Sequence, residues 1–196
     1  QALYTTDFNS ERLSVGDEAE TIFFYWQAQN GLILEKSYKF YPDRYKIGLT
    51  VSLVNRSDSP VSSDFVLEMT NPPPEGSTFV FEGPFAYVDQ DLKEIDVDDI
   101  EDKSVYSGEI KWAGIEDRYF MTALVPVKPV ETELRLSHKT SPEILGVAFL
   151  QPGRSLAPGE SRQISYELFM GPKRMSELKA FGHDLDEVIN FGFFDI

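Results

Sequence analysis

The sequence contains no cysteine among its 196 residues. This absence excludes disulfides, thiolate nucleophiles and cysteine-ligated metal sites. The length suits one large domain or two small ones. A chain of this size buries enough surface on folding to be stable without covalent cross-links.

Basic residues are scarce as well, with 18 Lys and Arg against 33 Asp and Glu, which gives a formal net charge of -15. A nucleic-acid-binding domain needs a basic patch that releases counterions from phosphates, so we exclude nucleic acid as a partner. The same balance argues against an electrostatic attraction of the whole chain to anionic lipid.

Long hydrophobic runs are missing too. The sequence contains no run of about 18 apolar residues, which a membrane-spanning helix requires. No signal peptide is visible at the start. We therefore interpret the sequence as a fragment of a longer chain.

Catalytic motifs are also absent. The sequence has no Gly-x-Ser-x-Gly elbow and no glycine-rich phosphate loop before a helix. Its two histidines stand in unlike contexts: His138 continues an apolar strand face, and His183 lies in a break between two helices. The acidic run Asp89–Asp102 lacks the spacing and the glycine of a calcium loop, so we interpret it as solvated surface. We expect no catalytic residue, no cofactor and no metal site.

The pattern that is present is that of β-strands. Apolar residues alternate with polar ones in three segments, as in strands with one face on a core; their apolar faces are Tyr45, Ile47, Leu49, Val51 and Leu53, then Thr132, Leu134 and Leu136, then Ile164, Tyr166, Leu168 and Met170. Three runs are apolar throughout and are expected to be buried on both faces: Thr21–Trp26, Tyr119–Val125 and Ile144–Leu150. About ten short strands, without a strand–helix rhythm, predict a sandwich or barrel.

The last part of the chain has helical character. Gly171-Pro172 is expected to close the final strand, with Pro172 opening a first helix that Gly182 ends. Asp184 followed by Glu187 resembles a capping box for a second helix. The apolar stripe of this helix and the aromatic end of the chain comprise Leu185, Val188, Ile189, Phe191, Phe193 and Phe194.

Two segments resemble a known family. Trp112–Pro126 (WAGIEDRYFMTALVP) is similar to a signature in the large periplasmic domain of bacterial YidC membrane protein insertases, in which Trp112, Tyr119, Phe120 and Pro126 are the matching residues. Glu167–Lys173 (ELFMGPK), which contains Gly171 and Pro172, followed by Leu185–Phe194, is similar to the end of the same domain. The strand Lys36–Asn55 resembles the early strands of the family, whereas the segment 57–103 matches weakly.

This resemblance implies a mostly β fold: an extended β-sandwich, or supersandwich, like that of galactose mutarotase, with two short C-terminal helices. It implies a sandwich domain over residues 1–170 and a helical segment over 171–196 that leads to a transmembrane helix outside this chain. The six family-motif residues are expected to be mainly structural.

The resemblance further implies a domain on the periplasmic side of the inner membrane. Its partners would be components of the Sec translocon and nascent membrane proteins, and it would position the membrane-proximal helix during insertion and folding. We therefore expect a non-catalytic domain. The six residues of the stripe and the aromatic end would contact the membrane interface; the alternative for Leu185–Ile189 is packing on the sandwich.

A second hypothesis is a periplasmic carbohydrate-binding or carbohydrate-modifying protein on a mutarotase-like sandwich. It requires aromatic faces that stack on a sugar, and Trp26, Trp112 and Tyr119 are the candidates. Trp26 and Tyr119 stand in apolar runs, for which core packing is the simpler interpretation.

Overall fold

The fold was taken from a computed structural model, which describes residues 3–73, 81–128 and 132–189. It is mostly β, with two sheets, and this confirms the predicted class. The chain divides into two compact units, residues 1–65 with 152–168 and residues 66–151 with 169–196. Three strands pass from one unit into the other: β5 (Val61–Asn71), β12 (Glu143–Leu156) and β13 (Ser161–Pro172).

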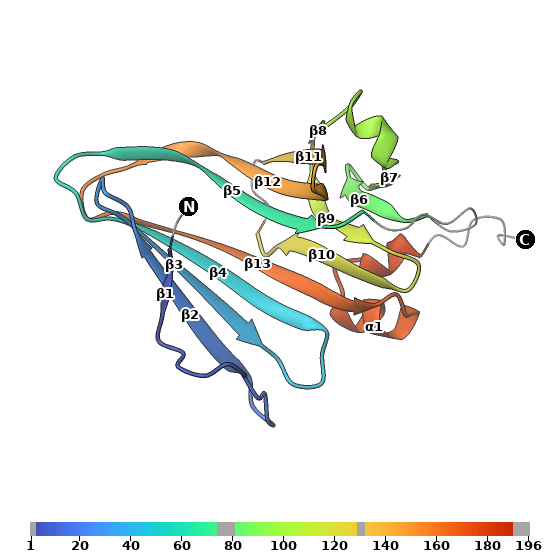
Figure 1. Cartoon of the computed structure of the whole chain (residues 1–196), viewed down its shortest axis with the longest axis horizontal. Helices are drawn as coiled ribbons and strands as arrows, with labels where there is room; N and C mark the ends of the chain where they lie inside the picture. The colour runs from blue at the N-terminus through green and yellow to red at the C-terminus, as the bar shows by residue number, and fades with distance from the viewer. Residues whose placement is uncertain (1–2, 74–80, 129–131, 190–196) are drawn as a thin grey trace, which may run out of the picture. The chain divides into compact units, whose positions relative to one another are not determined.

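The first unit is built on antiparallel strands that follow one another in the sheet as β1, β2, β3, β4 and β13 (Figure 1). The first four are β1 (Thr5–Thr6), β2 (Glu20–Gln27), β3 (Leu32–Phe40) and β4 (Lys46–Asn55). The alternation predicted for β4 is confirmed, because Leu49, Val51 and Leu53 are buried on one face. A tight connection joins β12 to β13, with Gly159 at φ +79°.

The prediction that Thr21–Trp26 is buried on both faces is wrong. Only Ile22 is buried there, and Trp26 is half-buried. The reason is the position of β2 in the sheet: among the described strands, only the two-residue β1 lies on its outer side, so β2 is next to the sheet edge. Its aromatic rings pack on one another instead, as in the stacked pair Phe23 and Tyr25, whose centroids lie 6.3 Å apart.

A buried asparagine ties the end of β4 to the loops beside it. Asn55 is fully buried, and its Nδ2 donates to the carbonyl oxygens of Ser59 (2.9 Å) and Leu156 (2.8 Å). Its Oδ1 accepts from the amide and the hydroxyl of Ser57, at 2.9 and 2.7 Å. The side chain therefore uses its full hydrogen-bonding capacity within the first unit.

Replacing Asn55 with alanine is expected to cost about 2 kcal/mol, because buried backbone groups lose their partners. Urea denaturation followed by circular dichroism measures the change. Asn30→Ala is the matched control, because Asn30 is exposed and accepts one bond, from the Leu32 amide at 3.2 Å. Equal losses in the two variants would contradict the role given to Asn55.

The second unit contains two sheets. One continues from the end of β13 through β10 (Phe120–Pro126), β9 (Ile110–Glu116), β6 (Gly83–Val88) and β7 (Asp91–Glu94). The other has the order β5, β12, β11 (Glu133–Thr140) and β8 (Val105–Ser107). A short 3-10 helix, η1 (Val97–Ile100), follows β7 within the acidic run.

Strands β9 and β10 are buried on both faces along most of their length. Successive side chains point to opposite faces, and the neighbours Trp112 and Ala113 in β9 and Ala123 and Leu124 in β10 are all buried. The apolar run Ile144–Leu150 is buried on both faces in its middle, as predicted, with Leu145, Val147 and Phe149 on one face and Gly146 and Ala148 on the other. The face of β9 that carries Trp112 is covered by the C-terminal helical segment, described below.

The burial pattern of β13 changes phase along the strand. Ile164 and Tyr166 are buried in the first unit, whereas Phe169 and Gly171 are buried in the second. The predicted apolar face of Ile164, Tyr166, Leu168 and Met170 is therefore correct only for its first half, and Met170 is 49% exposed. The switch falls where the strand passes from one unit to the other.

The C-terminal segment consists of α1 (Met175–Phe181) and a 3-10 turn, η2 (Leu185–Val188). Pro172 is the last residue of β13 and not the first residue of a helix, because Arg174 is the N-cap of α1. Gly182 ends α1 at φ +85°, as predicted. Within the described residues, no helix combines the length and hydrophobicity required to cross a bilayer.

Candidate functional site

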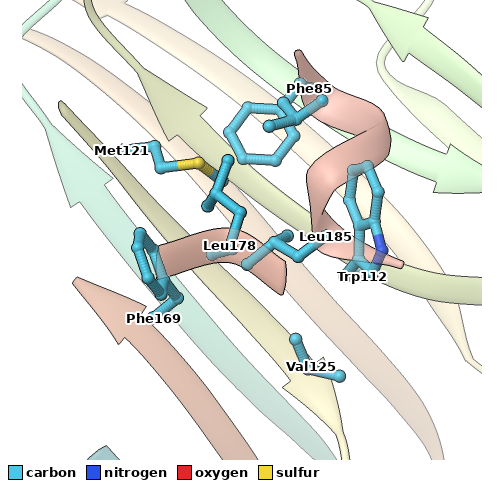
Figure 2. Packing of buried hydrophobic residues seen from close by; sticks show 9 residues of the cluster. Phe85, Trp112, Met121, Val125, Phe169, Leu178 and Leu185 are labelled. Atoms are coloured by element: carbon cyan, nitrogen blue, oxygen red, sulfur yellow. The ribbon is translucent and has the colours of Figure 1, made fainter. Parts of the chain in front are cut away.

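The C-terminal helical segment is packed into the core of the second unit. Figure 2 shows the side chains of Leu178 and Leu185 pointing into the space between Phe85, Met121, Phe169 and Trp112. Leu178 and Leu185 are fully buried, and Val188 is buried beside them. The segment is therefore an integral part of this unit, covering one face of β6, β9 and β10.

Trp112 fixes the turn between α1 and η2. The indole is fully buried, stacked on Tyr87 at a centroid distance of 4.9 Å and edge-on to Phe85 at 5.7 Å. Its Nε1–H donates to the carbonyl oxygen of His183 at 3.0 Å. One side chain therefore provides both apolar contact and the hydrogen bond that holds the turn.

The turn itself is left-handed over three consecutive residues, with φ of +85° at Gly182, +60° at His183 and +55° at Asp184. At His183 and Asp184, which are not glycines, such conformations persist only where surrounding contacts hold them. The predicted capping box is wrong: the Asp184 side chain makes no cap hydrogen bond and pairs instead with Lys111 of β9. Asp184 thus links the turn to the strand that also carries Trp112.

A buried ion pair lies at the other end of the segment. Glu116 is the last residue of β9 and is 2% exposed. Its Oε2 lies 3.0 Å from Nζ of Lys173, the residue that follows β13. The contact is an ion pair, and its atoms are not aligned as a hydrogen bond requires. It connects the β9–β10 hairpin to the entry of α1.

Burial raises the pKa of Glu116 to about 7, because desolvation disfavours the carboxylate. The ammonium of Lys173 lowers the pKa and limits the rise, while the negative charges of Glu94 and Asp117 add to it. Nothing in the sequence indicates this pair, because Glu116 and Lys173 meet only through the pairing of β9, β10 and β13.

The β9–β10 hairpin presents two aromatic side chains to solvent. Tyr119 is 63% exposed and Phe120 is 56% exposed. The expectation that Tyr119 packs in the core is therefore wrong. Asp117 Oδ1 accepts hydrogen bonds from the amides of both residues at 2.7 Å, and this turn ends the buried part of the strand.

The remaining predicted site residues have separate positions. Leu185 and Val188 are buried and Ile189 packs against the same core, in agreement with the packing alternative. Gly171 and Pro172 are buried at the end of β13. Pro126 is half-buried at the end of β10. The aromatic residues Phe191, Phe193 and Phe194 lie outside the described residues.

A cleft of about 420 Å³ lies beside the left-handed turn, between Tyr87, Lys111, Val125 and His183. Trp112 is stacked on Tyr87, which lines the cleft, and is fully buried, so its ring offers no face for a sugar to stack on. His183 is exposed, with its ring 5.7 Å from that of Phe181, whereas His138 lies 3.5 Å from Glu143. Searching the described residues finds no group of three or more His, Asp or Glu that could hold a metal ion.

Solved structures with a similar fold define the class. The chain superposes on GH36 α-galactosidase AgaA from Geobacillus stearothermophilus with a TM-score of 0.63 at 12% identity, covering 90% of this chain and 29% of that chain. It superposes on a galactose mutarotase related enzyme from Lactobacillus acidophilus with a TM-score of 0.58 at 10% identity, covering 85% and 70%. The protein is therefore a mostly β domain of the galactose-mutarotase-like sandwich class.

The family is shown by sequence. The model of the YidC periplasmic domain matches residues 1–196, and the chain belongs to this family. The membrane protein insertase YidC of Syntrophus aciditrophicus is 29% identical over 194 residues, and that of Geobacter sulfurreducens is 30% identical over 190. These matches cover 97% and 95% of this chain but 36% of each relative, so the chain spans about a third of the relatives' length. The predicted family is confirmed.

Proposed function

We propose that this chain is a non-catalytic domain of a YidC-type inner-membrane insertase, on the periplasmic side. It positions the membrane-proximal segment and docks partners during insertion and folding of membrane proteins. The partners are Sec translocon components and nascent membrane proteins. In this proposal, residues 1–170 form the docking sandwich and residues 171–196 lead toward the bilayer.

The observation that carries the proposal is the packing of the helical segment. Leu178, Leu185 and Val188 lie in the same core as Trp112 and Phe85. A segment held by buried side chains, an indole hydrogen bond and two ion pairs has a fixed orientation on its unit. The direction in which the chain leaves the domain is then set by the sandwich.

Phe191, Phe193 and Phe194 follow directly after this fixed segment. Aromatic side chains are favoured at the lipid–water interface. In the proposed function, the core residues Leu185 and Val188 hold the segment, and the three phenylalanines contact the membrane. Ile189 lies at the transition between the two.

The test loosens the segment within the full-length insertase. Leu178→Ala and Leu185→Ala are each expected to cost about 2–5 kcal/mol locally, because each leaves a cavity in the core. Combined in the full-length protein, they are expected to reduce insertion of reporter membrane proteins severalfold at equal protein level. Cells depleted of their own insertase provide the assay.

Lys179→Ala is the matched control, because Lys179 is on the same helix and exposed. It is expected to insert reporters like the parent protein. If the loosened double variant also inserts them at the parental rate, the positioning role is refuted.

A further inference from the structure

The β9–β10 hairpin has an exposed aromatic tip on a strand pair that is otherwise buried. Tyr119 and Phe120 are both more than half exposed. Met170, 49% exposed, lies on β13, which neighbours β10 in the sheet. Exposed apolar side chains grouped in this way mark an interaction surface more often than isolated ones do.

The tip is rigid. Asp117 accepts the two amide hydrogen bonds described above, and its own amide donates to the Phe120 carbonyl at 2.9 Å. The Lys173 amide donates to the carbonyl of Tyr119 at 2.8 Å. The backbone under both rings is therefore fixed before any partner binds, which lowers the entropic cost of binding.

The tip is also amphipathic. The guanidinium of Arg118 lies over the Tyr119 ring, 5.3 Å from its centroid. Arg174, just before α1, is exposed. Arg174 follows Lys173, whose amide donates to the Tyr119 carbonyl, so the chain near the tip carries two exposed arginines despite a net charge of -15. Aromatic rings together with arginine are the side chains that settle at the boundary between lipid headgroups and acyl chains.

We propose that Tyr119 and Phe120 form a membrane-contact tip that dips into the interface of a phospholipid bilayer. The inference rests on the proposed function, which holds the domain at a membrane. The bilayer is favoured over a protein partner because a stable protein interface needs about 800 Å² from each side. Two residues at the end of a hairpin offer far less contact area than that. Side chains that insert into the lipid–water interface need no pocket of matching shape.

The structure also places the tip beside the route of the C-terminal segment. Lys173, which is hydrogen-bonded to Tyr119 and paired with Glu116, is the residue from which the helical segment departs. The tip and the start of this segment are thus held together. In the proposed arrangement the tip and the C-terminal segment each contact the membrane. Two contacts fix the orientation of the domain relative to the bilayer, whereas one contact would leave it free to rotate.

The test reads the environment of position 120 directly. The sequence has no cysteine, so Phe120→Cys can be labelled with an environment-sensitive fluorophore at one site. The chain is held through a C-terminal histidine tag on vesicles of phosphatidylethanolamine and phosphatidylglycerol that contain a nickel-chelating lipid. We expect a blue-shifted emission that lipid-borne quenchers reduce.

Val66→Cys is the control, because Val66 is 53% exposed in the same unit but lies in β5. Its label is expected to keep the emission seen in buffer. Emission at position 120 that is unchanged on tethered vesicles would overturn the membrane-contact tip. A shift at both positions would overturn it too, since the contact would then be unspecific.

Untethered vesicle flotation separates this inference from the proposed function. Tyr119→Ser with Phe120→Ser is expected to lower the vesicle partition coefficient about tenfold, from the apolar area that no longer leaves water. If removal of residues 190–196 abolishes flotation but the double serine variant does not change it, the tip inference fails and the proposed function stands. If the double variant instead loses copurification with a translocon protein and shows no lipid effect, the tip binds protein and the inference is refuted.

Discussion

Trp112→Ala is expected to destabilise the second unit by about 3–5 kcal/mol, which is the usual cost of deleting a large aromatic side chain from a core. The loss combines a cavity next to Phe85 and Tyr87 with an unpaired carbonyl at His183. Guanidinium denaturation followed by far-UV circular dichroism measures it. Native-state hydrogen exchange should show the amides of α1 and η2 losing protection first.

Trp26→Ala is the matched control, since it removes the other tryptophan from a half-buried position. Its cost is expected to be clearly smaller. Trp112→Phe separates the two contributions, because it keeps an aromatic ring but removes the Nε1–H donor. Were Trp112→Ala to cost no more than Trp26→Ala, the central place given to Trp112 in this core would be untenable.

Glu116→Gln is expected to remove a pH dependence of about 3 kcal/mol from the free energy of unfolding. The folded-state pKa is about 7, above the ordinary glutamate value of 4.5. The folded protein therefore binds this proton more tightly than the unfolded chain does. The contribution of Glu116 to stability is full below pH 4.5 and is lost progressively as the pH rises through 7.

The measurement compares unfolding free energies of the parent and the variant at several pH values between 4 and 8. The difference between them should change across this window in favour of the variant. Glu109→Gln, an exposed carboxylate just before β9, is the control and should show no such change. Parallel curves for parent and Glu116→Gln would show that the carboxyl group is not protonated on burial.

Lys173→Met extends the same test to the partner. The ammonium of Lys173 lowers the pKa of Glu116, so its removal should move the loss of stability to higher pH. The two variants together show whether Glu116 and Lys173 act as one pair. If the changes in unfolding free energy caused by Glu116→Gln and Lys173→Met are independent of each other, the two side chains do not act as a pair.

The local parts of the fold follow from the sequence. The period-two pattern predicts the buried faces of β4 and β11, because Leu49, Val51 and Leu53 alternate with less buried residues in β4 and Leu134 and Leu136 do so in β11. Gly182 marks the end of α1, since its conformation needs no distant partner. These features depend on neighbours in the chain, and the sequence contains them directly.

The candidate site depends on contacts between distant segments and was predicted less well. The burial of Glu116 results from the pairing of β9 with β6 and β10. The exposure of Tyr119 results from the turn that Asp117 makes. Asp184 could cap its own helix or pair with Lys111, and only the arrangement of strand and turn decides between them.

The phase change in β13 has a consequence for folding fidelity. An ordinary amphipathic strand can slide by two residues and still bury its apolar face. In β13 the buried positions Tyr166 and Phe169 are three residues apart, so a slide by two residues would bring Glu167 into the buried position of Phe169. The phase change therefore disfavours such a slide, which an ordinary amphipathic strand would tolerate. A one-residue insertion between these positions is where the chain would tolerate change least.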